Sequence, residues 1–176
     1  EVLSATKTAV QTEYQQDDTL TYVVNILNSG NTTMTGVTIS DNLGAYTLNT
    51  LTLVPMDYVV GTVRYYVGGV LQPTPTVTAG PPLTISGLSV PAKGNVTVIY
   101  QAKTNDYAPL AQESSITNTA TINANNIANP ITASATVNAY SEPVLRISKS
   151  LTPTTVSENG QLTYTFIIQN YGNTAA

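Results

Sequence analysis

The sequence predicts an all-β protein with the immunoglobulin-like β-sandwich fold. Short alternations of apolar and polar residues recur along the chain, separated by turn residues, and no stretch shows a convincing helical period. Charged residues make up only 9% of the chain, so β-branched and uncharged polar residues fill most of it, as is typical of strands and turns. About nine strands fit into roughly the first 140 residues, and that number is typical of this sandwich.

The predicted strands follow from the alternation, taken in chain order. They lie at 3–10, 20–26, 36–43, 46–54, 57–67, 83–88, 95–103, 116–122 and 131–140. Gly and Asn clusters mark the turns between them, as at 28–31 and 68–69. The Pro-rich stretch 72–82 is predicted to be a long loop that could hold a short edge strand at 76–78.

The composition excludes several classes of function. The net charge is −4 without any basic stripe, so we expect no nucleic-acid partner. The chain has no Cys and no His, which removes thiolate chemistry, the commonest general base and the commonest metal ligand. We therefore expect no cofactor, no metal and no turnover enzyme. No apolar run is long enough to cross a bilayer, so we expect neither membrane insertion nor a signal peptide in this segment.

The end of the chain repeats its beginning at an offset of 142 residues. Lys149 matches Lys7, 162–164 matches 20–22, and the turn at 170–174 matches that at 28–32. A fixed period with matching turns indicates a tandem array. We expect residues 1–142 to form one complete unit and 143–176 to form the first two strands of the next. Because a lone hairpin is unstable in water, these two strands should pack on a longer array or on a neighbouring molecule.

Three polar side chains fall in the apolar phase of their strands, where side chains two residues apart share a face. They are Lys7 in the first strand, Asp41 in the third and Asn118 in the strand at 116–122. Each has a simple explanation by itself: the lysine could reach solvent, the aspartate could end its strand, and the asparagine could bond to backbone. Buried together, they provide the groups for an intramolecular Lys–Asn isopeptide bond.

The chemistry follows from burial. An amine in an apolar interior loses its proton and becomes a nucleophile, while a buried carboxyl group favours its protonated form and can donate to the carboxamide. Packing holds the reactants in place, so a bimolecular encounter becomes a pre-oriented one. Ammonia leaves, and the neutral amide that remains costs far less to bury than an ammonium group.

The segments Thr-Lys-Thr at 6–8, Asn-Ser-Gly-Asn-Thr-Thr-Met-Thr-Gly-Val-Thr-Ile-Ser-Asp at 28–41 and Ile-Thr-Asn-Thr-Ala-Thr-Ile at 116–122 resemble a family. It is the conserved surface-repeat domain of bacterial, especially Gram-positive, and some archaeal cell-surface proteins. The likeness covers nearly all of residues 1–140 and restarts at 143. The order of the three polar residues also resembles the isopeptide-forming sandwich of the collagen-adhesin type.

This resemblance implies a crosslink between Lys7 and Asn118, with Asp41 as the proton shuttle. Lys149 is the corresponding crosslink lysine of the next repeat, and Glu113 is an alternative acid. The implied protein is a bacterial one, located outside the cell, at the cell surface or in the cell wall.

We expect a structural module of a surface stalk, fibre or surface-layer protein, whose partners are neighbouring repeats or other copies of itself. One alternative is an adhesin or carbohydrate-binding module that recognises a glycan or host matrix ligand through the loops at 68–82 or 104–114. A second alternative is a fibre subunit that donates strands to its neighbour.

Overall fold

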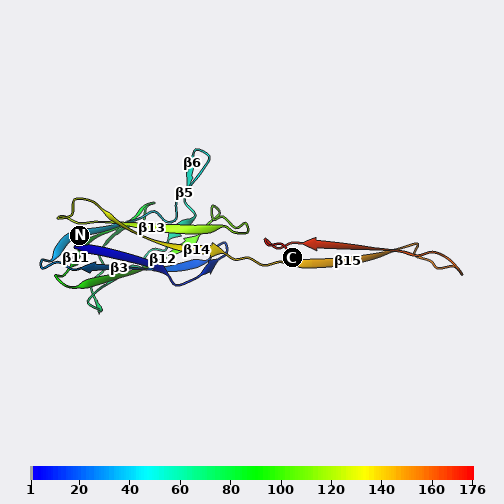
Figure 1. The fold of residues 1–176 in the computed structure, drawn as a ribbon, viewed down its shortest axis with the longest axis horizontal. Coiled ribbons are helices and arrows are strands. Elements are labelled where there is room, and N and C mark those ends of the chain that lie inside the picture. Colours follow the sequence, from blue (N-terminus) through cyan, green and yellow to red (C-terminus); the bar gives the residue numbers. More distant parts are fainter. Residues whose placement is uncertain (1) are drawn as a thin grey trace.

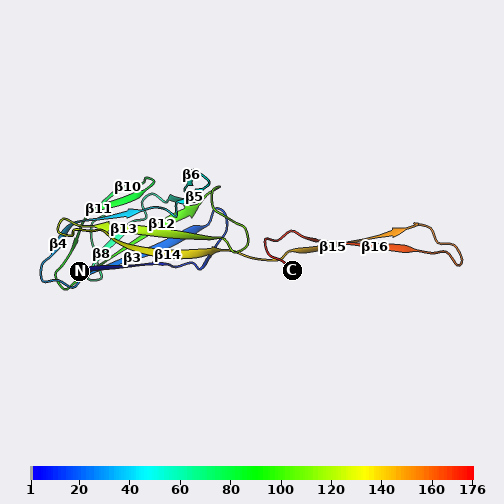
Figure 2. The same ribbon diagram turned by 45° about the horizontal axis from the view of Figure 1, so that its top comes forward.

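The computed structural model describes residues 2–176, and every regular element in this part of the chain is a β-strand. Two six-stranded sheets form the two layers of a sandwich, as the sequence predicts, and a separate hairpin extends beyond one end (Figures 1 and 2). Because residues 2–176 contain no helix, they contain none that is long and apolar enough to span a bilayer.

The first sheet has the order β1-β3-β12-β8-β9, and β7 pairs with β12. Its pairings between β1 and β3, and between β12 and each of β3, β7 and β8, are all antiparallel. The bounds of its strands are β1 Leu3–Ala9, β3 Thr19–Asn28, β7 Met56–Tyr58, β8 Arg64–Val67, β9 Val70–Leu71 and β12 Asn95–Thr104.

The second sheet has the order β10-β11-β4-β13-β14-β2. Its pairs are antiparallel except for β14 with β2, which is parallel and very short. The bounds of its strands are β2 Glu13–Tyr14, β4 Met34–Asp41, β10 Thr76–Thr78, β11 Leu83–Val90, β13 Ser115–Asn123 and β14 Ile131–Ala139.

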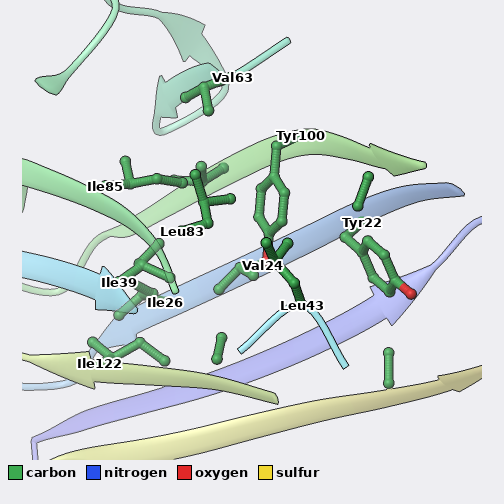
Figure 3. Close-up of a cluster of buried hydrophobic side chains, with 14 of the residues drawn as sticks. Tyr22, Val24, Ile26, Ile39, Leu43, Val63, Leu83, Ile85, Tyr100 and Ile122 are labelled. Atoms are coloured by element: carbon green, nitrogen blue, oxygen red, sulfur yellow. The ribbon is translucent and has the colours of Figure 1, made fainter. Parts of the chain in front are cut away.

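The core lies between the two sheets and consists of the inward-facing residues of their strands. Along β12 and β13, buried and more exposed residues alternate strictly, as a half-buried strand requires. Figure 3 shows aliphatic side chains from β3, β4, β11 and β13 around two tyrosines, Tyr22 and Tyr100. This tyrosine-containing part of the core holds the candidate site.

The sandwich contains more strands than the roughly nine that the sequence predicts, because fourteen strands, several of them only two or three residues long, lie within residues 2–142. The expected strand at 46–54 is a small hairpin, β5 Tyr46–Leu48 and β6 Leu51–Leu53, because Asn49 has a φ of 55° and reverses the chain. The expected strand at 57–67 is split into β7 and β8 by a turn containing Gly61, with φ 83°.

The hairpin at the end of the chain consists of β15 Leu145–Thr152 and β16 Thr163–Asn170. It repeats the β1–β3 pair in identical register: Lys7 lies opposite Val24, and Lys149 lies opposite Phe166, each 142 residues later (149 − 7 and 166 − 24). In the first pair one face is buried in the sandwich core, whereas Phe166 is 60% exposed. The hairpin thus has the geometry of a first strand pair without the sheet that covers it.

Candidate functional site

Lys7 enters the sandwich interior from the edge strand of the first sheet. It lies on β1 with its side chain completely shielded from solvent, so it does not reach outward as a surface lysine would. The partly buried Ala5 and Ala9 flank it on the same face. The apolar phase predicted from the sequence is therefore the inward face.

Asp41 is the last residue of β4, in the opposite sheet, and is also completely buried. Its Oδ2 accepts a hydrogen bond from Lys7 Nζ at 2.5 Å and another from the Tyr100 hydroxyl. Its Oδ1 accepts the backbone N–H of Leu43 at 2.7 Å. Leu43 has a φ of 52°, an uncommon conformation for a bulky residue, so the turn after β4 is shaped around this carboxylate.

Asn118 lies on β13, next to Asp41 in the same sheet. Asp41 is paired with Ala120, and Asn118 is two residues away from Ala120, so both side chains point into the core. Asn118 has no solvent exposure, and neither Oδ1 nor Nδ2 has a hydrogen-bond partner within residues 2–176. A buried polar group left without a partner costs about 1–3 kcal/mol, so this carboxamide is unusual in a folded core.

Two tyrosines enclose the amine. Lys7 Nζ lies 4.8 Å from the centroid of the Tyr22 ring and 5.7 Å from that of the Tyr100 ring. Burial first, and then the charge of Asp41, raises the pKa of Tyr22, whereas the Asn118 carboxamide lowers it by a polar interaction with the phenol that falls short of a hydrogen bond of good geometry. Tyr22 therefore neighbours both the Lys7 amine and the Asn118 carboxamide.

The electrostatics of the site shift Lys7 towards its neutral form. Burial lowers the pKa of Lys7, and the charge and hydrogen bond of Asp41 oppose this only in part. Burial, followed by the neighbouring Asp41 carboxylate, raises the pKa of Tyr100 well above its usual value. The phenol therefore stays protonated and remains a hydrogen-bond donor to Asp41.

The structure brings three of the predicted residues, Lys7, Asp41 and Asn118, into one buried cluster; their chemical roles stay predictions. Glu113, the alternative acid, is exposed, with a φ of 65°, so it lies outside this cluster. The sequence reasoning missed the part played by Tyr100. The available signal was its position in phase with Val98 and Ala102 on β12, which puts a phenol hydroxyl into the core.

Lys149 lies outside the buried site. It is exposed on β15, and its Nζ is 4.4 Å from the centroid of the Tyr164 ring and 5.5 Å from that of Phe166. Tyr164 corresponds to Tyr22 at the 142-residue offset (164 − 22), so the lysine–tyrosine contact is the same in both hairpins. The strand pair alone is thus sufficient to position this lysine.

No group of three or more His, Cys, Asp or Glu side chains suited to hold a metal ion occurs within residues 2–176. The fold and the buried cluster together define a β-sandwich that holds an amine, a carboxylate and an unpartnered carboxamide in its interior. Comparison with protein-family models and with curated proteins gives no match for this chain.

Solved structures match the fold well at low sequence identity. They include the BcpA D312A major pilin subunit of Bacillus cereus, with TM-score 0.60 and 12% identity over 97% of this chain and 56% of that one. The RrgB pilus backbone of Streptococcus pneumoniae matches with TM-score 0.55 and 16% identity, over 70% of this chain and 31% of that one. The SpaD major pilin of Corynebacterium diphtheriae matches with TM-score 0.56 and 13% identity, over 84% of this chain and 36% of that one.

These structural neighbours are two major pilins and one pilus backbone protein. The chain spans between 31% and 56% of the length of these three proteins. The likeness establishes a shared immunoglobulin-like sandwich fold.

Proposed function

We propose that this chain is a structural module of an extracellular surface fibre or stalk, stiffened by an autocatalytic isopeptide bond between Lys7 and Asn118. The observation that carries the proposal is the Asn118 carboxamide, fully buried without a hydrogen-bond partner beside the Lys7–Asp41 pair. Such a group is costly as a spectator, but it is the electrophile that a neighbouring neutral amine requires.

The reaction uses only the groups of the cluster. Lys7 gives one ammonium proton to Asp41, and the freed lone pair of Nζ attacks Cγ of Asn118. Asp41 then donates a proton to Nδ2 and takes one from Nζ, so the Cγ–Nδ2 bond breaks and NH3 leaves with its electron pair. One new amide bond joins Nζ to Cγ, Nζ keeps a single hydrogen, and Asp41 ends the reaction protonated.

The product removes two costs of the unreacted site. A buried ammonium and an unpaired carboxamide become one neutral amide, which is far cheaper to shield from water. Asp41 still has Tyr100 and the Leu43 N–H as partners after the lysine charge is gone. The site therefore suits the crosslinked state better than the unreacted state.

The position of the bond explains its mechanical use. β1 belongs to the first sheet and β13 to the second, so a Lys7–Asn118 bond would tie the two layers across the core. A load on the ends of the module would then pass through this bond and would not peel β1 from the sandwich. The mass of the intact chain tests the bond directly, because the product lacks one ammonia.

The structural neighbours and the composition of the chain fit a fibre at the cell surface. The matched proteins include major pilins and a pilus backbone, and the sparse charge of this chain suits an exposed protein with few sites for trypsin-like proteases. Neighbouring repeats or other copies of the chain would be the partners. Binding to an array of glycans and matrix proteins tests the adhesin alternative. An adhesin should bind members of the array, whereas a pure spacer should bind none.

We also propose that residues 1–142 are one repeat and that 143–176 begin the next. The identical register of β1–β3 and β15–β16 supports this division. Lys149 would be the crosslink lysine of the second repeat, held over Tyr164 until strands equivalent to β4 and β13 supply an acid and an asparagine.

A second candidate, a fibre subunit that donates strands, is favoured by the uncovered face of the hairpin. Ile147, Phe166 and Ile168 are each at least 60% exposed. In this case the hairpin would complete the sandwich of a neighbouring copy, where Lys149 would compete with Lys7 for Asn118. Denaturing electrophoresis separates the two candidates: heat-stable ladders that disappear in Lys149→Arg support donation, and a single monomer band contradicts it.

A further inference from the structure

The side chain of Asn173 joins the hairpin to the end of the sandwich. Its Nδ2 donates to the backbone carbonyl of Leu110 at 3.0 Å and to that of Tyr140 at 2.5 Å. Its Oδ1 accepts the backbone N–H of Glu142 at 3.0 Å. The carboxamide thus binds three backbone groups at the end of the sandwich from which the hairpin extends (Figure 2).

The backbone of Gly172 lies directly against the connecting segment. A Cβ at this position would lie 1.9 Å from the carbonyl oxygen of Glu142 and 2.8 Å from Cα of Pro143, so only glycine allows this approach. The connection is also fixed at its far side, because Val144 donates its N–H to Asn170 Oδ1 and accepts the N–H of Tyr171. The segment at 142–144 is therefore held along its length rather than left as a free linker.

The same turn occurs in the first unit, at its opposite end. Asn28 Nδ2 donates to the Thr32 carbonyl and its Oδ1 accepts the Gly30 N–H. Asn170 makes the same two bonds 142 residues later (170 − 28), to the Thr174 carbonyl and the Gly172 N–H. The first-unit counterpart of Asn173 is Asn31 (173 − 142), which is exposed and makes no bond like those of Asn173 to any group within residues 2–176.

We infer that this turn is the docking end of each unit, and that its asparagine fixes the angle between consecutive units. Its partner surface is the opposite end of another copy of the same unit, formed by the carbonyls of Leu110 and Tyr140 and the N–H of Glu142. Asn173 occupies that surface within this chain, and Asn31 presents the same donor and acceptor groups to the end of a preceding unit. The joint needs no isopeptide bond, so it is independent of the crosslink.

Distance measurements between two spin labels test the joint. The chain has no cysteine, so Thr132→Cys on β14 and Thr163→Cys on β16 would label the sandwich and the hairpin specifically. The parent should give one narrow distance distribution. Asn173→Ala should lose that narrow peak, because the three bonds to the sandwich end are removed.

Asn31→Ala is the matched control, since it removes the same side chain from the equivalent turn, where no unit is docked. It should keep the parent distribution. The inference is overturned by a broad distribution in the parent, by an unchanged peak in Asn173→Ala, or by equal broadening in Asn31→Ala. The parent and Asn173→Ala measurements should also be repeated in an Asn118→Ala background, which cannot form the crosslink. The same loss of the narrow peak there would show that the joint does not depend on the crosslink, and a failure of the joint would not argue against the crosslink.

Discussion

Lys7 Nζ lies 2.5 Å from Asp41 Oδ2, and neither side chain is exposed to solvent. The two residues come from opposite sheets, so their ion pair crosses the sandwich core. A buried pair of this kind is weak evidence for stability, because removing both charges from water costs about as much as their attraction returns. In the proposed function the ion pair instead holds the Lys7 amine beside Asn118, with which it would react.

Loss of the crosslink should lower stability sharply. The bond would close a loop of 111 residues (118 − 7), for which unfolded-chain entropy alone gives about 4–5 kcal/mol at 25 °C. Asn118→Ala should therefore unfold roughly 10–20 °C below the parent in a thermal scan followed by circular dichroism. The matched control is Asn126→Ala, an exposed asparagine, which should retain the parent Tm. An equal Tm for Asn118→Ala and the parent would count against the bond.

The uncrosslinked variant should become more stable as the pH rises. In Asn118→Ala, burial still lowers the pKa of Lys7 from its usual 10.5, so the unfolded chain holds the proton more tightly than the folded one. The free energy of unfolding should therefore increase as the pH rises from the pKa of Lys7 in the folded chain towards 10.5, because folding no longer has to remove that proton. In a crosslinked parent Lys7 would be an amide and would contribute no such slope.

Urea unfolding at a series of pH values up to about pH 9 measures this difference. The upper limit matters because burial raises the pKa of Tyr14 to about 12 and that of Tyr22 further, so tyrosine ionisation favours the unfolded chain at higher pH. Lys7→Met in the Asn118→Ala background is the control and should lose the slope. A slope that persists in this double variant would show that Lys7 is not its source.

Force applied to the chain ends should not extend the segment inside the crosslink. Pulling the parent in a single-molecule experiment should give a contour-length gain about 400 Å shorter than pulling Lys7→Ala, since 111 residues (118 − 7) extend by at most about 3.6 Å each. Lys103→Ala removes an exposed lysine and should behave as the parent does. Equal gains in the parent and Lys7→Ala would mean that no covalent bond bypasses the segment.

Much of the site could be predicted because strand parity decides which side chains point inward. Lys7, Asp41 and Asn118 each lie on the same face of their strand as its apolar residues. Their burial therefore follows from local alternation once the strands are assigned. The partners of Asp41 could not be predicted in this way. Tyr100 reaches it from the opposite sheet, a contact that depends on how the two layers pack.

The strands that were missed or miscounted have equally physical reasons. β2 is a two-residue parallel pairing with the end of β14, which is too short to leave an alternation in the sequence. The hairpin β5–β6 depends on the left-handed conformation of Asn49, which asparagine adopts readily but does not require. Backbone reversals and edge pairings of this kind are set by tertiary contacts rather than by local pattern.

The most direct test of the central claim is the mass of the intact, denatured chain. The crosslink predicts that the parent lacks the mass of one ammonia molecule, and that Lys7→Ala, Asp41→Ala and Asn118→Ala each show the full mass of their sequence. Peptide mapping of the parent should place the loss in a branched peptide that contains Lys7 and Asn118. A parent chain with the full mass of its sequence would contradict the account.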